Sequence, residues 1–325
     1  MSKLTNLAIA AFASAMLVSA ATSQAVAQSS YPDRDVRWVI PWNPGGSNDI
    51  MARRLQPLLE EEGVSTVIEN IPGGTGAVGM GEVATAQPDG YTIGNGTSST
   101  LAIIAQNRAP LENDHFTHII RLSVDPLILV VPGESEHDTL DAFLQNMKNN
   151  PGDITIGTPG TNNLNHIFAA MTARAADTDY RHVPQTGGSS VIRDLMGRHI
   201  DAGVLKPSET IEQIESGDLI PIGIFADERI DALPDVPTFE EIGYDVFPYG
   251  PVVQMGYIEA PANLDPEVRE KLTKAFYNAI NSDEFIKFAE DNGFELSPIH
   301  GEELEQEIKD VSEAIKQVAS EVFES

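Results

Sequence analysis

The sequence predicts an α/β fold with a mainly parallel sheet, organised as two domains or as one large one. Short β-branched apolar runs alternate with segments of helical spacing along most of the chain. The junctions between them carry clusters of Gly, Pro, Asn and hydroxyl residues, which are typical of turns. The chain has 325 residues, which is long enough for more than one hydrophobic core.

The first part of the chain predicts three strands separated by two helices. Val36–Pro41 (VRWVIP) is expected to form a buried strand, because it is short, apolar and bounded by turn residues. Helical spacing follows as far as Gly63, with Pro57 predicting a kink or a break. Further strands are expected at Val64–Glu69 and from Tyr91, with a Gly-rich turn and a short helix between them.

The same alternation continues from Pro126 to the end of the chain. Strands are predicted at 126–131, 154–157, 180–183, 200–205, 219–225 and 252–257. Helices are predicted at 139–149, at 163–176 and from the turn at 186–189 through Met196. Two amphipathic, charge-rich helices at 265–280 and 302–323 are expected to close the chain.

The first 27 residues have the three parts of a secretory signal peptide. Lys3 precedes an apolar run at 7–20, and Ala25-Val26-Ala27 has the small residues of a cleavage site. The run of 14 residues is shorter than the roughly 20 that a spanning helix needs. We therefore expect cleavage after Ala27, leaving residues 28–325 as a periplasmic protein without a membrane insertion.

The composition excludes several classes of function. The absence of cysteine rules out disulfides, thiolate metal sites and a cysteine nucleophile. The formal charge of −29, or −30 once Lys3 is removed, disfavours nucleic-acid binding and attraction to an anionic membrane. The acidic excess indicates a solvated surface, and a halophilic or marine source is a hypothesis that follows from it.

Three turns after predicted strands carry the chemistry of an anion site. Each turn places glycine and short hydroxyl or amide side chains at a predicted helix start, at 44–49, 158–163 and 186–190. Free backbone amides and the positive end of the helix dipole bind anions at such positions. In an open α/β sheet these turns gather at the carboxyl ends of the strands. The pattern favours a small anion, with a carboxylate as the expected ligand.

The sequence motifs that would indicate a cofactor, a catalytic site or a metal site are incomplete. The stretch 74–79 fits G-x-G-x-x-G, but the acidic residue expected after the next strand is missing, so no dinucleotide cofactor is expected. Neither a G-x-S-x-G elbow nor a P-loop occurs, and no nucleophile–base set emerges, so the chain is not expected to be an enzyme. His115 and His118 lack a nearby third ligand, so no metal site is expected. His166 can donate to an anion or simply pack.

The same residues resemble the substrate-binding receptors of tripartite tricarboxylate transporters, the Bug family, TctC-like. The matching stretches run in order through nearly the whole mature chain. They are Tyr31-Pro32, the strand VRWVIP, 44–53, 69–76, 88–92, 156–160 with His166, 183–188 and 232–238.

The resemblance implies a periplasmic-binding-protein type II fold, with two α/β domains joined by two crossing strands. Domain one would comprise 28–125 plus 248–325, and domain two 126–247. The ligand would be clamped between the domains and delivered to membrane permease subunits. By position, the ligand-binding residues would be Trp42, Asn43, Gly45, Gly46, Ser47, Asp49, Gly74, Thr97, Ser98, Thr158, Gly160, Thr161, Asn165, His166, Thr186 and Gly187.

Departures from the family pattern leave the ligand open among aromatic, di- or tricarboxylic and amino acids. Gln185-Thr186 replaces a common Tyr-Lys pair, and Lys206 lies in a stretch that is usually Asp-Asn. Lys206 is either an exposed flanking residue or a cleft residue that pairs with a second carboxylate. Asp49 stabilises the helix start, orients its loop or binds an ammonium. The alternative functions are a secreted hydrolase or isomerase using the same cleft, and a ligand sensor for a membrane kinase.

Overall fold

The fold consists of two five-stranded sheets. The computed structural model describes residues 31–247 and 252–323, and the account below concerns the compact unit that begins at Arg34. The predicted signal peptide lies outside the described residues. Sheet A has the strand order β2–β1–β3–β10–β4, with bounds Thr66–Asn70, Val36–Ile40, Thr92–Thr97, Met255–Pro261 and Phe116–Val124. Sheet B has the order β7–β6–β8–β5–β9, with bounds Arg181–Pro184, Thr155–Thr158, Ala202–Leu205, Leu127–Pro132 and Leu219–Phe225.

The two sheets share one pattern of strand direction. In sheet A, β1 runs parallel to β2 and β3, whereas β10 runs antiparallel to β3 and β4. In sheet B, β6 runs parallel to β7 and β8, whereas β5 runs antiparallel to β8 and β9. The sheets are thus mixed, and less parallel than the alternation of strands and helices predicts. The antiparallel strand of each sheet is the one at which the chain arrives from the other sheet.

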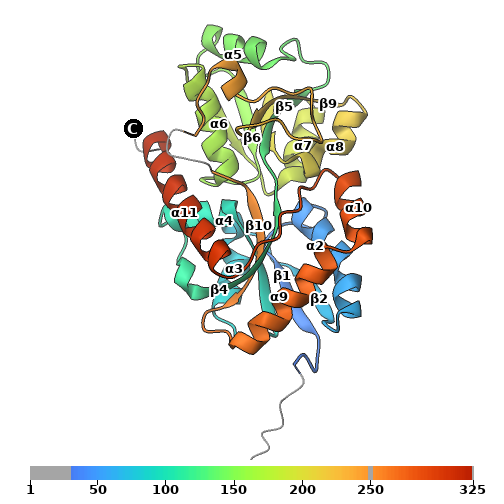
Figure 1. Ribbon diagram of the computed structural model, residues 1–325. Coiled ribbons are helices and arrows are strands. Elements are labelled where there is room, and N and C mark those ends of the chain that lie inside the picture. The colour runs from blue at the N-terminus through green and yellow to red at the C-terminus, as the bar shows by residue number, and fades with distance from the viewer. Residues whose placement is uncertain (1–30, 248–251, 324–325) are drawn as a thin grey trace, which may run out of the picture. The chain divides into compact units, whose positions relative to one another are not determined.

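The chain crosses between the sheets twice. It leaves sheet A between β4 and β5, where only Asp125 and Pro126 separate the two strands. It returns to sheet A ahead of β10. Figure 1 shows these crossing strands running through the middle of the molecule between the two groups of helices.

Ten α-helices are described, and they surround the sheets (Figure 1). Those that belong with sheet A are α2 (Ser47–Glu61), α3 (Ala77–Ala84), α4 (Ser98–Ala105), α9 (Pro266–Ile280) and α10 (Asp283–Asp291). Those that belong with sheet B are α5 (Leu140–Asn149), α6 (Leu164–Ala175), α7 (Gly188–Met196) and α8 (Pro207–Glu215). The last helix, α11 (Glu302–Phe323), packs against both α4 and α6 and so links the two groups. No helix within the described ranges is long and apolar enough to cross a membrane.

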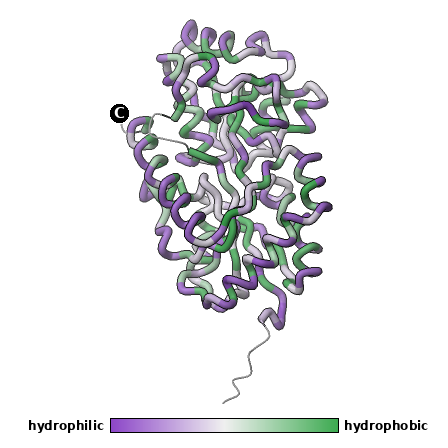
Figure 2. Tube along the Cα trace, viewed as in Figure 1, coloured by the Kyte–Doolittle hydropathy of each residue, from purple (hydrophilic) through white to green (hydrophobic). Residues whose placement is uncertain are grey.

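The core follows the strands. Figure 2 shows hydrophobic residues along the sheets and hydrophilic residues on the outer sides of the helices. Every residue of β5 is buried, as expected for a strand covered on both faces. In the other half, Trp38 on β1 meets Phe276 on α9 edge to face, with ring centroids 5.2 Å apart.

Several elements differ from the sequence-based expectation. The helix α2 continues through Pro57 to Glu61, so the predicted break does not occur. The strand β4 was not predicted, because it carries the buried polar residues His118 and Arg121. These side chains find carboxylate partners on α11, almost 190 positions away in the sequence, at Glu305 and Glu307. The helices α4, α8 and α10 were also not predicted.

Candidate functional site

The predicted helix starts meet around a cavity between the two sheets. Its empty volume, counted with the solvent space at its mouth, is about 480 Å³. The lining residues come from the first turns of α2, α4, α6, α7 and α8, from the segments before these helices and from the residue before β10. They are Trp42, Asn43, Gly46, Ser47, Asn48, Thr97, Ser99, Pro159, Asn165, Gly187, Gly188, Ser189, Lys206, Glu209 and Gln254. We call this space the inner cavity.

A second space, the outer cavity, shares Trp42, Asn43 and Pro159 with the first and has an empty volume of about 1050 Å³. Its remaining lining comes from three segments, one that follows sheet A strand β2 and two at the ends of the sheet B strands β6 and β7. These residues are Pro72, Gly73, Gly74, Thr75, Gly76, Gly160, Thr161, Pro184, Gln185 and Thr186.

The structure divides the predicted ligand-binding residues into three groups. Eight line the inner cavity: Trp42, Asn43, Gly46, Ser47, Thr97, Asn165, Gly187 and Lys206. Four line only the outer cavity: Gly74, Gly160, Thr161 and Thr186. Five line neither: Gly45, Asp49, Ser98, Thr158 and His166. Their assignment as ligand contacts stays a prediction. The hydrogen bonds described below show the role of each residue within the fold.

Asp49 holds the loop that precedes α2. Its Oδ2 accepts hydrogen bonds from the Gly45 amide at 2.9 Å and from Arg53 Nε at 3.0 Å. Arg53 also donates to Asn70 Oδ1, and Asn70 donates to the carbonyl of Trp42 at 3.2 Å. Burial pushes the pKa of Asp49 up, but the hydrogen bonds from Arg53, Gly45 and Asn70 hold it below its ordinary value. Of the predicted roles for Asp49, the structure therefore shows loop orientation.

His166 stabilises the loop before α6. Its Nδ1 accepts from the backbone amide of Asn162 at 3.0 Å, and Asn162 has a positive φ of 59°. The ring stacks on His182 with centroids 3.6 Å apart. Burial, with the charges of His182 and Arg108, lowers the pKa of His166 to about 3, so the ring is neutral near pH 7.

Thr158 and Ser98 likewise form hydrogen bonds with backbone groups. The Thr158 hydroxyl donates to the carbonyl of Gly160 at 2.6 Å and accepts from His182 Nε2 at 2.6 Å. Ser98 Oγ donates to the carbonyl of Val253 at 2.6 Å and accepts from the Met255 amide at 2.9 Å. Both hydroxyls therefore position the loops that line the cavities.

Hydrogen bonds join the two sides of the cleft. Asn43 Nδ2 donates to the carbonyl of Thr186 at 3.0 Å, and Thr75 Oγ1 donates to that of Thr161 at 3.3 Å. Deeper inside, Ser99 Oγ lies 3.2 Å from Asn165 Oδ1. Loops from sheet A and sheet B thus close the inner cavity from both sides.

Two charged side chains line the inner cavity, Lys206 and Glu209. Lys206 Nζ lies 3.1 Å from Asp125 Oδ2, so its charge is already paired within the protein. Glu209 lies so close to the start of α7 that a Cβ on Gly188 would be 2.7 Å from its Cδ. Burial raises the pKa of Glu209 against the lowering effects of the Lys206 charge and of hydrogen bonds from the Lys206 and Ser47 amides.

Two hydrogen-bond donors in the cavity wall have no partner among the described residues. They are the Ser47 hydroxyl, on a residue only 2% exposed, and the Trp42 indole Nε1. Buried polar groups are nearly always hydrogen bonded. Both groups are therefore available to a ligand in the inner cavity.

Sequence reasoning missed several lining residues. Asn48, Gly188 and Ser189 belong to turns that the sequence singled out, and Gln254 lies within the predicted strand 252–257. Ser99 and Glu209 lie in the first turns of α4 and α8, two helices that were not predicted. Glu209 carries only the local signal of a helix-capping acid, which says nothing about a cleft.

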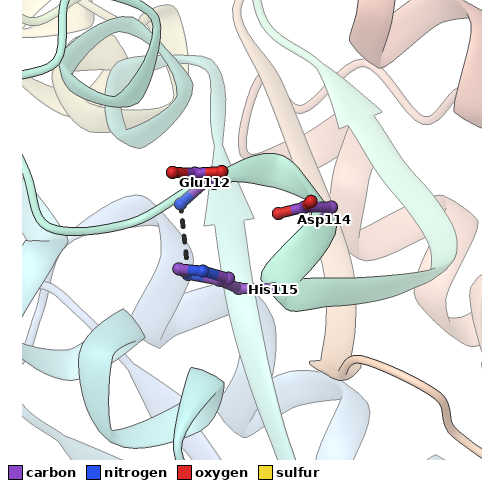
Figure 3. A group of neighbouring side chains, drawn as sticks. All are labelled: Glu112, Asp114 and His115. Carbon is purple, nitrogen blue, oxygen red and sulfur yellow. Dashed lines mark hydrogen bonds between the residues drawn. The ribbon is translucent and has the colours of Figure 1, made fainter.

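One group of possible metal ligands occurs away from the cleft. Glu112, Asp114 and His115 offer ligand atoms within 4.8 Å of one another on a short 3-10 turn (Figure 3). All three are exposed, and the Glu112 amide donates to His115 Nδ1 at 3.2 Å. This hydrogen bond accounts for the position of the histidine as part of the turn. His118, by contrast, is buried and pairs with Glu259 and Glu305.

Comparison with known proteins agrees with this architecture. Residues 51–322 match the family described as tripartite tricarboxylate transporter family receptor. A protein of Agrobacterium vitis, named UPF0065 protein in the TAR-I ttuE-ttuC' intergenic region, is 30% identical over 79% of this chain and 74% of its own. A solved structure titled as that of a periplasmic transporter has a TM-score of 0.83 at 30% identity, covering 89% of this chain and 97% of that one.

The periplasmic binding protein BugD has a TM-score of 0.81 at 26% identity, covering 90% of this chain and 98% of its own. These likenesses confirm the predicted fold of two α/β domains of the periplasmic-binding-protein type. They also confirm the resemblance on which that expectation was based.

Proposed function

The chain belongs to the tripartite tricarboxylate transporter receptor family, and we propose that it captures a small carboxylate between its two sheets for a membrane permease. The family consists of solute-binding receptors and not of enzymes. The ligand would be bound in the inner cavity, with the outer cavity as its route of access. The predicted signal peptide and the periplasmic relatives support a periplasmic location.

The convergence of helix N-termini at the inner cavity carries this proposal. Gly46, Gly187 and Asn163 are the N-cap residues of α2, α7 and α6, and the first two line the cavity. Unpaired amides and the positive end of the helix dipole at such starts favour a carboxylate. The net charge of −29 does not oppose local binding, because surface charge is screened over about 8 Å at physiological salt.

We propose closure of two domains around the ligand, with residues 28–125 plus 248–325 on one side and 126–247 on the other. The hydrogen bonds from Asn43 to Thr186 and from Thr75 to Thr161 would form on closure. The short Asp125-Pro126 connection would serve as one of the hinges. The closed form would then be the one that the permease subunits recognise.

A thermal-shift screen of small carboxylates tests the proposal. A true ligand present at 100 times its Kd stabilises the folded protein by about 2.7 kcal/mol, which raises the melting temperature measurably. The ligand is then incubated with the protein and recovered unchanged. Release of a product would favour the hydrolase or isomerase alternative, and the absence of any stabilising carboxylate would refute carboxylate capture.

Uptake measurements separate transport from sensing. Cells that lack the receptor are expected to lose uptake of the identified carboxylate and to regain it when the receptor is restored. Unchanged uptake, together with a lost transcriptional response to the carboxylate, would favour a sensor for a membrane kinase.

A further inference from the structure

From the charges in the inner cavity, we infer that the ligand is a carboxylate that also carries a positively charged amino group, and that Glu209 binds this group. The inference rests on the proposed function, because it names the class of carboxylate that the same cavity takes. It assigns Glu209 as a residue that determines ligand specificity.

The charge balance of the cavity is the first step. Lys206 and Glu209 are the charged residues among those that line it. Lys206 is paired with Asp125 at 3.1 Å, and the two side chains are only 6% and 1% exposed. The pair is therefore neutral overall, and Glu209 has no ion-pair partner of its own among the described residues. A buried charge is stable only when a partner offsets the loss of hydration.

The position of Glu209 is the second step. Its carboxylate lies against the start of α7, where a Cβ on Gly188 would be 2.7 Å from Glu209 Cδ. A protein carboxylate thus already uses the helix end at which a ligand carboxylate was expected. An additional carboxylate placed there would lie beside Glu209 and be repelled by it.

The unpaired donors of the cavity are the third step and an independent sign of a ligand. The Ser47 hydroxyl is buried without a partner among the described residues, and so is the indole Nε1 of Trp42. Trp42 lines both cavities, so it lies where the outer cavity meets the inner one. These donors suit a ligand carboxylate on the Trp42 side, with the amino group directed to Glu209.

Neighbouring acids strengthen the preference. Burial and the charge of Asp125 both raise the pKa of Glu209, so Asp125 is a second acid near Glu209. The cavity and its immediate surroundings thus hold two acids, Glu209 and Asp125, and one lysine, Lys206. A ligand amino group adds the missing positive charge, whereas a dicarboxylate adds to the negative excess.

A structural role for Glu209 has to be separated from ligand binding. Glu209 occupies the third position of α8, and its Oε2 lies 3.5 Å from the Lys206 amide, as in a capping box. Glutamine serves equally well at this position of a capping box. Glu209→Gln therefore keeps the cap and the shape of the side chain and removes only the charge.

The test measures affinity by calorimetry for pairs of compounds that differ only in the amino group. Suitable pairs are L-glutamate with glutarate, L-alanine with propionate and L-phenylalanine with 3-phenylpropionate. We expect the native protein to bind the amino member of at least one pair about 10-fold or more tightly than its partner. Glu209→Gln is expected to reduce that preference at least about 10-fold. The control Asp141→Asn, which neutralises an exposed acid in the first turn of α5, is expected to leave both affinities unchanged.

The outcomes that overturn the inference are distinct from those that overturn the proposed function. Tighter binding of the amino-free member by the native protein refutes the inference and leaves carboxylate capture standing. So does a Glu209→Gln variant that binds amino-free carboxylates more tightly and keeps its amino-acid affinity, since Glu209 would then only compete with the ligand. Binding of no member of any pair, together with no stabilising carboxylate in the thermal-shift screen, would refute both. The comparison within the native protein decides the question even if the variant does not fold.

Discussion

Lys206 Nζ lies 3.1 Å from Asp125 Oδ2, and this contact ties the start of α8 to the crossing between the two sheets. Both side chains are almost fully buried. Ser123 on β4 adds a hydrogen bond to the same carboxylate oxygen at 3.3 Å. The lysine that the sequence offered as a partner for a second ligand carboxylate therefore has a carboxylate of its own inside the protein. Its predicted role toward a ligand stays untested.

Breaking this pair is expected to be costly, whereas replacing both residues is not. Lys206→Met leaves Asp125 buried and uncompensated, which is expected to lower the free energy of unfolding by about 3–5 kcal/mol. The double variant Lys206→Met with Asp125→Leu is expected to recover most of this loss, because no buried charge remains. Urea unfolding of the three proteins measures the difference. A double variant that is less stable than either single variant would contradict this account.

The close contact between Gly96 and Tyr257 predicts that even one methyl group is not tolerated there. The two residues are paired across β3 and β10, and a Cβ on Gly96 would lie 2.2 Å from Tyr257 Cε2. Gly96→Ala is expected to lower the free energy of unfolding by about 3 kcal/mol. Gly81→Ala is the matched control, because a Cβ there meets no atom within 4 Å in the interior of α3. That control is expected to gain up to about 1 kcal/mol. Equal effects of the two substitutions would be inconsistent with the packing.

Glu259 is expected to make the protein less stable as the pH rises. It is 3% exposed beside His118 and Tyr257, and burial raises its pKa from 4.5 to about 7, against the opposing charge of His118. Between these two values the folded state keeps a proton that the unfolded chain has lost, so the free energy of unfolding falls with rising pH. The full effect is about 3 kcal/mol.

The comparison with Glu259→Gln isolates this effect. The stability of the native protein is expected to fall relative to that of the variant from about pH 4.5 to about pH 7 and then to level off. Chemical unfolding at several pH values measures the difference. Parallel pH profiles for the two proteins would show that Glu259 does not titrate in this range.

The unpaired Ser47 hydroxyl is expected to matter for the ligand and not for the fold. Ser47→Ala removes a buried hydroxyl without a described partner, so the free energy of unfolding is expected to stay unchanged or to rise slightly. Affinity for the ligand is expected to fall about 10-fold through the loss of one hydrogen bond. The control is Ser208→Ala, whose hydroxyl is also buried and unpaired but is not part of the cavity wall. Equal affinities of the two variants would show that the ligand does not use Ser47.

Much of the architecture was predictable because it follows local patterns. The turns at 44–49 and 186–190 combine glycine with short polar residues after apolar runs, and both lie at helix starts that line the inner cavity. The helices α9 and α11 were predicted almost to the residue, because their amphipathic spacing is long and regular. The strand β4 was missed because its buried His118 and Arg121 depend on carboxylates of α11, which no local pattern reveals.

The sequence by itself determined the α/β alternation, the glycine-rich helix starts and the family to which the chain belongs. Only the tertiary structure decided which of the polar residues line the inner cavity. In the fold, Lys206 pairs with Asp125, Asp49 and His166 hold loops, and Glu209 lies against Gly188 at the start of α7. Charge pairing and burial depend on distances in space, and residues such as Asp125 and Lys206 are 81 positions apart in the chain. For this reason spacing along the sequence located the cleft, whereas its electrostatic character emerged only from the fold.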